Sequence, residues 1–594
     1  MLRTRVPALI SLLLLVTLGL FIPAVQADCQ PTTGTPGNDT ITCSGSNDAD
    51  GVDTGTGSDK VLLVSGTVLN TIKSSGDSLI VIINGGKLDT SAATYAIDMT
   101  NGGTLNVTGN IKAGVYAIWI EGDGSVTSTG NIDAGDVAIW VDGTGNIISA
   151  GNINVSEQGI LLNGTGNVTS TGNINSGFIG ISVNGAGTVI SIGNINADSQ
   201  GIDINGAGTV TSTGNINANF IGISVNGAGT VTSRGNINSG SQGININGAG
   251  TVTSTGNINA GFIGISVNGA GTVTSRGNIN ADSEGIEING VGTVTSTGNI
   301  NSGFIGISVN GAGTVISTGN INADSQGIDI NGAGTVTSTG NINANFIGIS
   351  VNGAGTVTST GNINAGFIGI SVNGGGTVTS TGNITSQNTG IDGSSGSQSV
   401  IVNGSINAPT AVNLNDGNDQ LYIIHDSHLN GTINMGSGDD TVQIGNHAVI
   451  PDMIDGGSGG EVNGDTLIIG GGQVCSENDQ EVAEFKDLKT LNPSLTSVTY
   501  LGQTYTWENF EHLLRGGYVA PCVGKINDGR INAYDEGAPD ALYCTVDHGV
   551  SNWDIDLQGQ GTFTFAVTAQ QISDGFAQAV SSGQNQPIGS DAEG

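Results

Sequence analysis

Six aspartates in the chain have the sequence surroundings of ligands for a hard cation. They lie close to glycines, and in most of these segments an apolar residue follows the aspartate by two positions. Glycine allows a turn to curl until backbone carbonyls and a carboxylate converge, and Ca²⁺ prefers such oxygen ligands. The sequence therefore predicts calcium sites built around Asp39, Asp59, Asp419, Asp439, Asp440 and Asp465. The alternative is that aspartate and glycine simply form turns here.

The segments that carry these aspartates resemble the glycine-aspartate nonapeptide of RTX-type calcium-binding proteins, G-G-x-G-x-D-x-U-x. Near the N-terminus they read GTPGNDTI from Gly34 and GTGSDKV from Gly55. Near the C-terminus they read DGNDQL from Asp416, GSGDDTV from Gly436 and GDTL from Gly464. The resemblance implies that a cation is shared between consecutive turns. Asp440 stands one repeat length after Asp419, so we expect the two to stack on adjacent coils.

The elements that position these turns come from a 21-residue repeat. From Gly109 to Gly382 a G-N-I sequence opens each unit, and the unit from Gly256 to Arg276 reads GNINAGFIGISVNGAGTVTSR. Short runs in which β-branched residues alternate with polar ones indicate strands, and the glycines between them indicate tight corners. Three short strands per unit predict an all-β fold, a parallel β-solenoid (β-helix) of 21-residue coils, with a small C-terminal β-rich module.

The interior of the solenoid follows from the alternation of side chains along each strand. In the unit that begins at Gly256, we expect the side chains of Ile258, Ile265, Val267 and Val273 to point inward. We expect Ser266, Thr272 and Thr274 to point outward. Asparagines at two corners, Asn257 and Asn268 in this unit, should form ladders of hydrogen bonds with their equivalents in neighbouring coils.

Two aromatic patterns leave their roles open. Phenylalanine recurs in every second unit, at Phe178, Phe220, Phe262, Phe304 and Phe346, which indicates a duplicated two-coil block. Acidic residues repeat in step with it, and a spaced acidic row for cations or a basic partner is the alternative. Trp119 and Trp140 stand one coil apart; they either close the end of the core or form a stacked pair that binds sugar rings.

Composition limits the classes of function. The chain has 594 residues, of which 102 are glycine and 4% are aromatic, and its net charge is −36. Nucleic acid is not an expected partner, because phosphate binding needs clustered lysine and arginine. Residues 1–27 have a basic start, an apolar centre and a small-residue cleavage site, which predicts a signal peptide and a secreted, extracellular or cell-surface protein. After cleavage we expect no integral membrane segment.

The remaining chain divides by composition. We expect a Gly/Asp-rich N-terminal cap (28–60), the solenoid (61–470), a C-terminal cap with bulky side chains (471–520), a small β module (521–568), and a short helix with an acidic tail (569–594). In an exported chain, Cys29 with Cys43 and Cys522 with Cys544 have spacings that suit disulfides, which leaves Cys475.

The texture of the repeat resembles that of autotransporter-like adhesins and other bacterial surface β-helix proteins. The resemblance implies a secreted or cell-surface structural or adhesive protein, here with calcium at its ends, and no enzymatic activity. Its expected partners are cell-surface or extracellular-matrix components, glycans among them, and other copies of the chain. One alternative is a polysaccharide lyase or hydrolase of the β-helix type. Another is an ice-binding solenoid, because Thr272 and Thr274 with their equivalents would form two outward threonine columns.

Overall fold

The computed structural model describes residues 28–31, 33–45, 47–48, 51–470, 494–500 and 502–515, together with five short strands beyond them. The chain divides into two compact units. Unit 1 comprises residues up to 143 with 149–151, and unit 2 comprises 144–148 and the residues from 152 onward. All regular elements in the described residues are β-strands. The predicted all-β, parallel solenoid is therefore confirmed for this part of the chain.

In unit 1, successive coils build two parallel sheets. One sheet takes one strand from each coil: β2 (Thr40–Ser44), β5 (Ser58–Leu63), β8 (Ser78–Ile83), β11 (Gly103–Thr108) and β14 (Gly124–Ser128). The other sheet takes two strands from each coil, such as β12 (Ile111–Ala113) and β13 (Tyr116–Ile120). The coils here differ in length, unlike the 21-residue repeat. Val61 pairs with Val81, 20 residues later, and Val81 pairs with Val107, 26 residues later.

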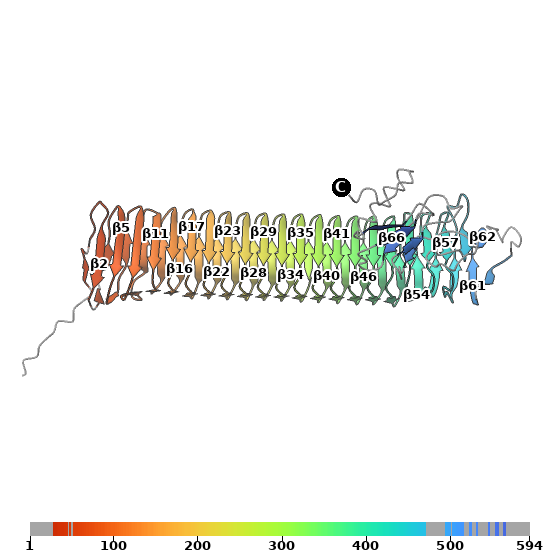
Figure 1. The fold of residues 1–594 in the computed structure, drawn as a ribbon, viewed down its shortest axis with the longest axis horizontal. Helices are drawn as coiled ribbons and strands as arrows, with labels where there is room; N and C mark the ends of the chain where they lie inside the picture. Colours follow the sequence, from red (N-terminus) through yellow and green to blue (C-terminus); the bar gives the residue numbers. More distant parts are fainter. Residues whose placement is uncertain are drawn as a thin grey trace, which may run out of the picture. The chain divides into compact units, whose positions relative to one another are not determined.

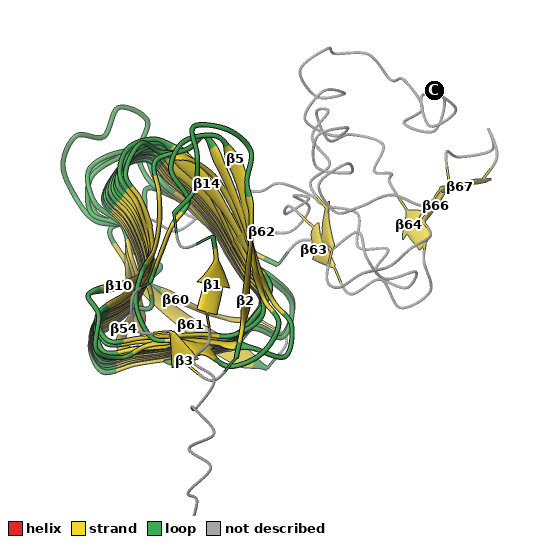
Figure 2. Cartoon of the chain, turned by 90° about the vertical axis from the view of Figure 1, so that its left-hand side faces the viewer, coloured by secondary structure: helices red, strands yellow, loops and turns green. Residues whose placement is uncertain are grey.

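In the regular coils of unit 2, the same three strands recur with a constant offset of one repeat. One coil contains β33 (Ile258–Ala260), β34 (Ile263–Val267) and β35 (Gly271–Ser275). Each strand pairs in parallel with its equivalent in the next coil, for example Ile258 with Ile279 and Val273 with Val294. Figure 1 shows these strands following one another in sequence order, and in Figure 2 they superpose as the walls of the coil.

The core of unit 2 is a set of stacked aliphatic columns. Ile258, Ile265, Val267 and Val273 are completely buried, as predicted, and Thr272 is exposed. A single coil has too little apolar surface for a core of its own, so stability comes from contact with its neighbours. The prediction for Ser266 is wrong: only 1% of this residue is exposed.

The reason lies in a bend at Gly264. A Cβ atom on Gly264 would lie 2.4 Å from Cγ2 of the core residue Ile279. Gly264 therefore faces the interior next to Ile265, which interrupts the strict alternation within β34. The residues on either side, Ile263 and Ser266, are 6% and 1% exposed.

Asparagine ladders run along unit 2. Asn268 donates from Nδ2 to Oδ1 of Asn247 at 2.8 Å, which confirms the predicted amide ladder. At the other predicted corner the side chain bonds to backbone instead, because Asn236 Oδ1 accepts from the N–H of Asn257. A third ladder, exemplified by Asn259 and Asn238, was not predicted. Such bonds satisfy polar groups at the corners, where the β-ladder ends.

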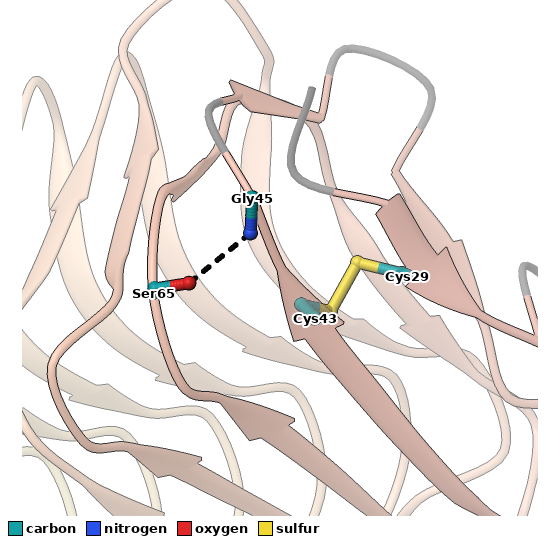
Figure 3. Close-up of a disulfide and its surroundings, with 4 residues drawn as sticks. All are labelled: Cys29, Cys43, Gly45 and Ser65. Carbon is teal, nitrogen blue, oxygen red and sulfur yellow. Dashed lines mark hydrogen bonds between the residues drawn. A yellow bond between two sulfur atoms is a disulfide. The ribbon is translucent and has the colours of Figure 1, made fainter. Parts of the chain in front are cut away.

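Each unit contains an antiparallel pair of strands beside its parallel coils. In unit 1, β1 (Asp28–Gln30) pairs antiparallel with β2 and is joined to it by the predicted disulfide Cys29–Cys43 (Figure 3). In unit 2, β60 (Ser497–Tyr500) pairs antiparallel with β61 (Gln503–Glu508), whose Tyr505 and Trp507 are buried. These strands cover the edge of a parallel stack that would otherwise be open to pairing.

Several predictions lie outside the described residues. These are the signal peptide, Cys475, and the short helix with its acidic tail. In the predicted β module, β63 (Cys522–Gly524) pairs with β65 (Cys544–Val546) in a register that aligns Cys522 with Cys544. The strands β64 (Arg530–Asn532), β66 (Trp553–Asp556) and β67 (Thr562–Phe565) form a second small sheet.

Candidate functional site

Three of the predicted aspartates lie in one column of unit 2. They stand just before or at the start of β55 (Gln420–Ile423), β57 (Thr441–Ile444) and β59 (Thr466–Ile469), which pair in parallel. Asp419 and Asp465 are 0% exposed, and Asp440 is 1% exposed. In the coil before Asp419, this position is occupied by Gln398, the first residue of β53 (Gln398–Val402). Gln398 pairs with Gly376 of the last regular coil, so regular coils carry glycine at this position. Buried carboxylates therefore replace glycine in the last coils.

Each of these carboxylates accepts a hydrogen bond from the backbone of the preceding coil. Asp419 Oδ1 accepts from Gln398 N at 2.6 Å, and Asp440 Oδ1 accepts from Asp419 N at 2.7 Å. Asp465 Oδ1 accepts from Asp440 N at 2.8 Å, and Glu511 Oε2 accepts from Asp465 N at 2.8 Å. We call Asp419, Asp440 and Asp465 the aspartate column. The predicted stacking of Asp419 on Asp440 is confirmed.

The second oxygen of each carboxylate in the aspartate column has no hydrogen-bond partner. Oδ2 of Asp419, Asp440 and Asp465 is buried in every case. Burial raises the pKa of Asp419 and Asp465 to about 7 and that of Asp440 to about 6, and neighbouring carboxylates add to each shift. An unpartnered buried carboxylate oxygen is costly. A proton or a cation at this column would relieve that cost.

The aspartate column fits a hard cation in the chemistry of its donors. Carboxylate oxygens and backbone carbonyls are ligands for Ca²⁺, and glycine turns surround the column, with Gly456 close to Oδ2 of Asp465. In the described residues, however, no group of three or more His, Cys, Asp or Glu side chains is arranged to hold a metal ion. A cation here would therefore need backbone oxygens as well as the column.

Asp439 lies beside the column but has different contacts. Its Oδ1 accepts hydrogen bonds from the backbone N–H groups of Val462, Asn463 and Gly464, and its Oδ2 accepts from Asn463 Nδ2. These bonds, led by that from the Asn463 backbone, hold the pKa of Asp439 below its ordinary value. Its carboxylate caps the turn at 461–464.

The two N-terminal candidates lie in unit 1 and form a shorter version of the same arrangement. Asp59 is 1% exposed, its Oδ1 accepts from Asp39 N at 2.9 Å, and its Oδ2 is buried without a partner. Asp39 is partly exposed and accepts hydrogen bonds from the backbone and hydroxyl of Thr35. Only Asp59 therefore has an unpartnered buried oxygen comparable to those of the aspartate column.

Sequence reasoning did not find Gln398 and Glu511, which continue the aspartate column at its two ends. Gln398 precedes Asp419 by one repeat length, so its place was available from the repeat. The place of Glu511 could not be predicted from the repeat, because the chain between 465 and 511 departs from the repeat length. Its carboxylate bonds Asp465 N only because β62 (His512–Arg515) pairs with β59.

The outer surface of unit 2 carries the other candidate features, all as repeated rows. Thr272 and its equivalents line a shallow groove of about 1550 Å³ together with the adjoining alanines and glycines. Phenylalanines form a second row at every second coil, and Phe220 and Phe262 are 51% and 50% exposed. The row ends with Phe346 and Phe367 stacked at a centroid distance of 5.3 Å.

Trp119 and Trp140 lie on the outer face of β13 and of β16 (Val137–Val141) in unit 1, not in the core. They alternate with the buried Ile118, Ile120, Ile139 and Val141, and their rings stack at a centroid distance of 5.4 Å. The interpretation that they close the end of the core is therefore wrong, and their stacking is confirmed.

Within the described residues, no helix has the length and apolar character needed to cross a membrane.

Comparisons with protein-family models, with curated proteins and with solved structures found no match to this chain.

Proposed function

We propose that this chain is a secreted or cell-surface structural protein with an adhesive role, and that calcium stabilises its C-terminal coils. The observation that carries the adhesive role is the repetition of outer side chains in register, coil after coil, in unit 2. Many copies of one weak contact along a single molecule bind by avidity. The expected partners are glycans or proteins of cell surfaces and extracellular matrix.

The adhesive role is testable by changing the number of coils. Deleting residues 256–297 removes two whole units and joins Thr255 to Gly298, which restores the T-G junction of the repeat. The shortened chain should keep its β-sheet circular-dichroism spectrum and bind less strongly to mammalian cells and to immobilised matrix. Equal binding by the two chains would show that the repeated rows do not carry adhesion.

The calcium role rests on the aspartate column. Asp419, Asp440 and Asp465 would supply carboxylate oxygens, and turn carbonyls would supply the remainder. Bound calcium neutralises carboxylates that burial otherwise opposes, and a ligand that binds only the folded state stabilises it by about 3 kcal/mol at a hundred times its Kd. Removing calcium should therefore lower the thermal midpoint.

Scanning calorimetry with calcium and with EDTA measures this effect. In the Asp419→Asn, Asp440→Asn and Asp465→Asn triple variant, calcium should have little effect on the midpoint. Asp89→Asn is a matched control, since Asp89 lies in unit 1 and pairs with Lys112 at the surface. A calcium response equal in the triple variant and the wild type would place the ion elsewhere.

Ice binding is a second candidate, favoured by the outer face of β35 and its equivalents. Thr272 is exposed, Thr274 is partly exposed, and each pairs with threonine in the next coil. Ile190 and Ile316 interrupt the second column. A thermal-hysteresis measurement on the full chain tests this candidate, and absence of hysteresis would exclude it.

A further inference from the structure

Four aromatic rings lie together on the outer face of unit 1. They belong to β10 (Tyr95–Met99), β13 and β16 (Val137–Val141), which pair in parallel with Tyr95 opposite Tyr116 and Trp119 opposite Trp140. The two tyrosine rings stack at 5.4 Å, and Tyr95 lies 4.4 Å from the ring of Trp119. All four residues are partly exposed. The aromatic rings therefore form a continuous stack on the outside of the coil.

A cavity of about 510 Å³ opens at the N-terminal end of this stack. Tyr95 contributes to its lining, and the other lining residues include Asn70, Thr71 and the column Asp53, Lys73 and Asp98. The register places Asp53 opposite Lys73, and Lys73 opposite Asp98. Trp119 follows Asp98 in the same column. This column thus changes from charged to aromatic side chains in consecutive coils, and the cavity lies at the change.

The position of Tyr95 makes it an aromatic wall of the cavity. Tyr116 and Trp119 lie in the next coil toward the C-terminus, whereas Asn70, Thr71 and Lys73 lie in the preceding coil. The side of the tyrosine ring directed away from Tyr116 is therefore directed to the cavity. An aromatic ring beside a few fixed hydrogen-bonding groups is a common arrangement in ligand sites.

The chemistry of the lining selects a saccharide. The C–H face of a pyranose ring packs on an aromatic ring, and its hydroxyls bond to carboxylate, amide and ammonium groups. Asp53 and Asp98 against Lys73 give the cavity one net negative charge, which opposes acidic sugars. Burial raises the pKa of Asp98, and the Lys73 ammonium partly offsets this shift. Hydroxyl groups of a neutral sugar can donate to Asp98 without adding charge.

The tryptophans give an independent reason to look for a function. The indole N–H groups of Trp119 and Trp140 are buried and have no hydrogen-bond acceptor. A buried donor without an acceptor costs about 1–3 kcal/mol, so aliphatic side chains would stabilise this surface better. Serine occupies the equivalent position of many coils of unit 2, as at Ser266. The aromatic stack is thus a local departure from the repeat that leaves two buried donors without acceptors.

We propose that this cavity binds a neutral hexopyranose unit of a glycan, with Tyr95 as the stacking wall and Asp53, Asn70, Lys73 and Asp98 as hydrogen-bonding groups. The inference deepens the proposed adhesive function by naming a ligand class and a site in unit 1. The repeated rows of unit 2 would add avidity to this contact.

Isothermal titration of the full chain with mannohexaose, cellohexaose and polygalacturonate tests the proposal. We expect at least one neutral oligosaccharide to bind and polygalacturonate to bind at least tenfold more weakly. Binding should also change the tryptophan fluorescence, because Tyr95 contacts Trp119. No binding of either neutral oligosaccharide, or preferential binding of polygalacturonate, would overturn the proposal.

Matched variants locate the site. Tyr95→Ala, Lys73→Ala and Asp98→Asn should each weaken binding tenfold or more. Tyr422→Ala, Lys112→Ala and Asp89→Asn change the same residue types outside the cavity and should leave binding unchanged. Wild-type affinity in all three cavity variants would overturn the proposal. If the cavity variants lose sugar binding while adhesion still depends on the number of coils, the site and the repeated rows act separately. If the two-coil deletion leaves adhesion unchanged and the chain still binds sugar, only the adhesive role of the repeated rows is contradicted.

Discussion

Asp440 accepts a hydrogen bond of 2.7 Å at Oδ1 from the backbone N–H of Asp419, while its own Oδ2 is buried without a partner. The two oxygens of one carboxylate therefore have different roles. Oδ1 joins consecutive coils, and Oδ2 is available to a proton or a cation. Substitutions can separate these roles, because asparagine keeps an oxygen acceptor and alanine does not.

In calcium-free buffer at pH 8, Asp440→Ala should destabilise the protein and Asp440→Asn should not. Alanine leaves the buried N–H of Asp419 without an acceptor, which costs about 1–3 kcal/mol. Asparagine keeps the acceptor and removes a charge that burial opposes. Urea denaturation followed by circular dichroism measures both changes. Equal destabilisation by the two substitutions would show that Oδ1 does not join the coils.

The sequence predicted the fold well because the repeat is strict. A fixed offset of one repeat determines which residues pair, so the column of Asp419 and Asp440 and the asparagine ladder at Asn268 followed from spacing alone. The unpartnered state of Asp440 Oδ2 did not follow, since it depends on how deeply the side chain is buried. The bonds that occupy Asp439 depend on the turn at 461–464, which has no equivalent in the repeat.

The surface was harder to predict than the core. Alternation predicts that Ser266 points outward, but the bend at Gly264 interrupts the alternation and Ser266 is buried. In unit 1, the ring of Tyr95 lies against the ring of Trp119 of the next coil. The separation of these two residues in the chain is not one repeat length, so spacing gave no sign of the contact.

Glu284 should make the stability of unit 2 depend on pH. Burial, followed by the charges of Glu287 and Asp329, raises its pKa from 4.5 to about 7. Because the folded protein holds this proton more tightly than the unfolded chain, its favourable contribution is complete below pH 4.5 and is lost as pH rises through about 7. At pH 8, Glu284→Gln should stabilise the protein by about 1–3 kcal/mol, allowing for its partial exposure.

The pH dependence of the urea midpoint tests this prediction. Glutamine stands at the equivalent positions two units before and two units after, at Gln242 and Gln326, so the substitution fits the fold. Wild type and Glu284→Gln should have equal midpoints at pH 4 and different midpoints at pH 8. A constant difference at all pH values would mean that the effect does not come from ionisation.

Asn268→Ala should weaken two junctions between coils. Asn268 donates to Asn247 at 2.8 Å and accepts from Asn289 at 2.8 Å. Each bond to an exposed side chain contributes about 0.5–1 kcal/mol, so the expected loss is about 1–2 kcal/mol. Thr272→Ala in the same coil is the control and should change stability by less than about 0.5 kcal/mol. Faster hydrogen exchange limited to neighbouring coils would support the ladder, and no local change would count against it.

Removing the disulfide should affect the first coil. Cys29 and Cys43 enclose a short loop and join β1 to β2. Restricting such a loop in the unfolded chain contributes about 3 kcal/mol. The Cys29→Ser, Cys43→Ser double variant should therefore lose hydrogen-exchange protection in β2 first, with little change in unit 2. Simultaneous loss of protection in both units would show that the disulfide stabilises more than the end of unit 1.

Gly264→Ala should be a damaging single-methyl change in the regular coils. The new Cβ would lie 2.4 Å from Ile279 Cγ2 and 2.5 Å from the carbonyl oxygen of Gly285. The core columns continue through neighbouring coils, so neither atom can withdraw without displacing the next coil. Overpacking of this kind costs about 1–3 kcal/mol or more. Gly37→Ala is the control, because its Cβ would meet only Thr35 Oγ1, at 3.7 Å. If the two variants had equal urea midpoints, the bend at Gly264 would not require glycine.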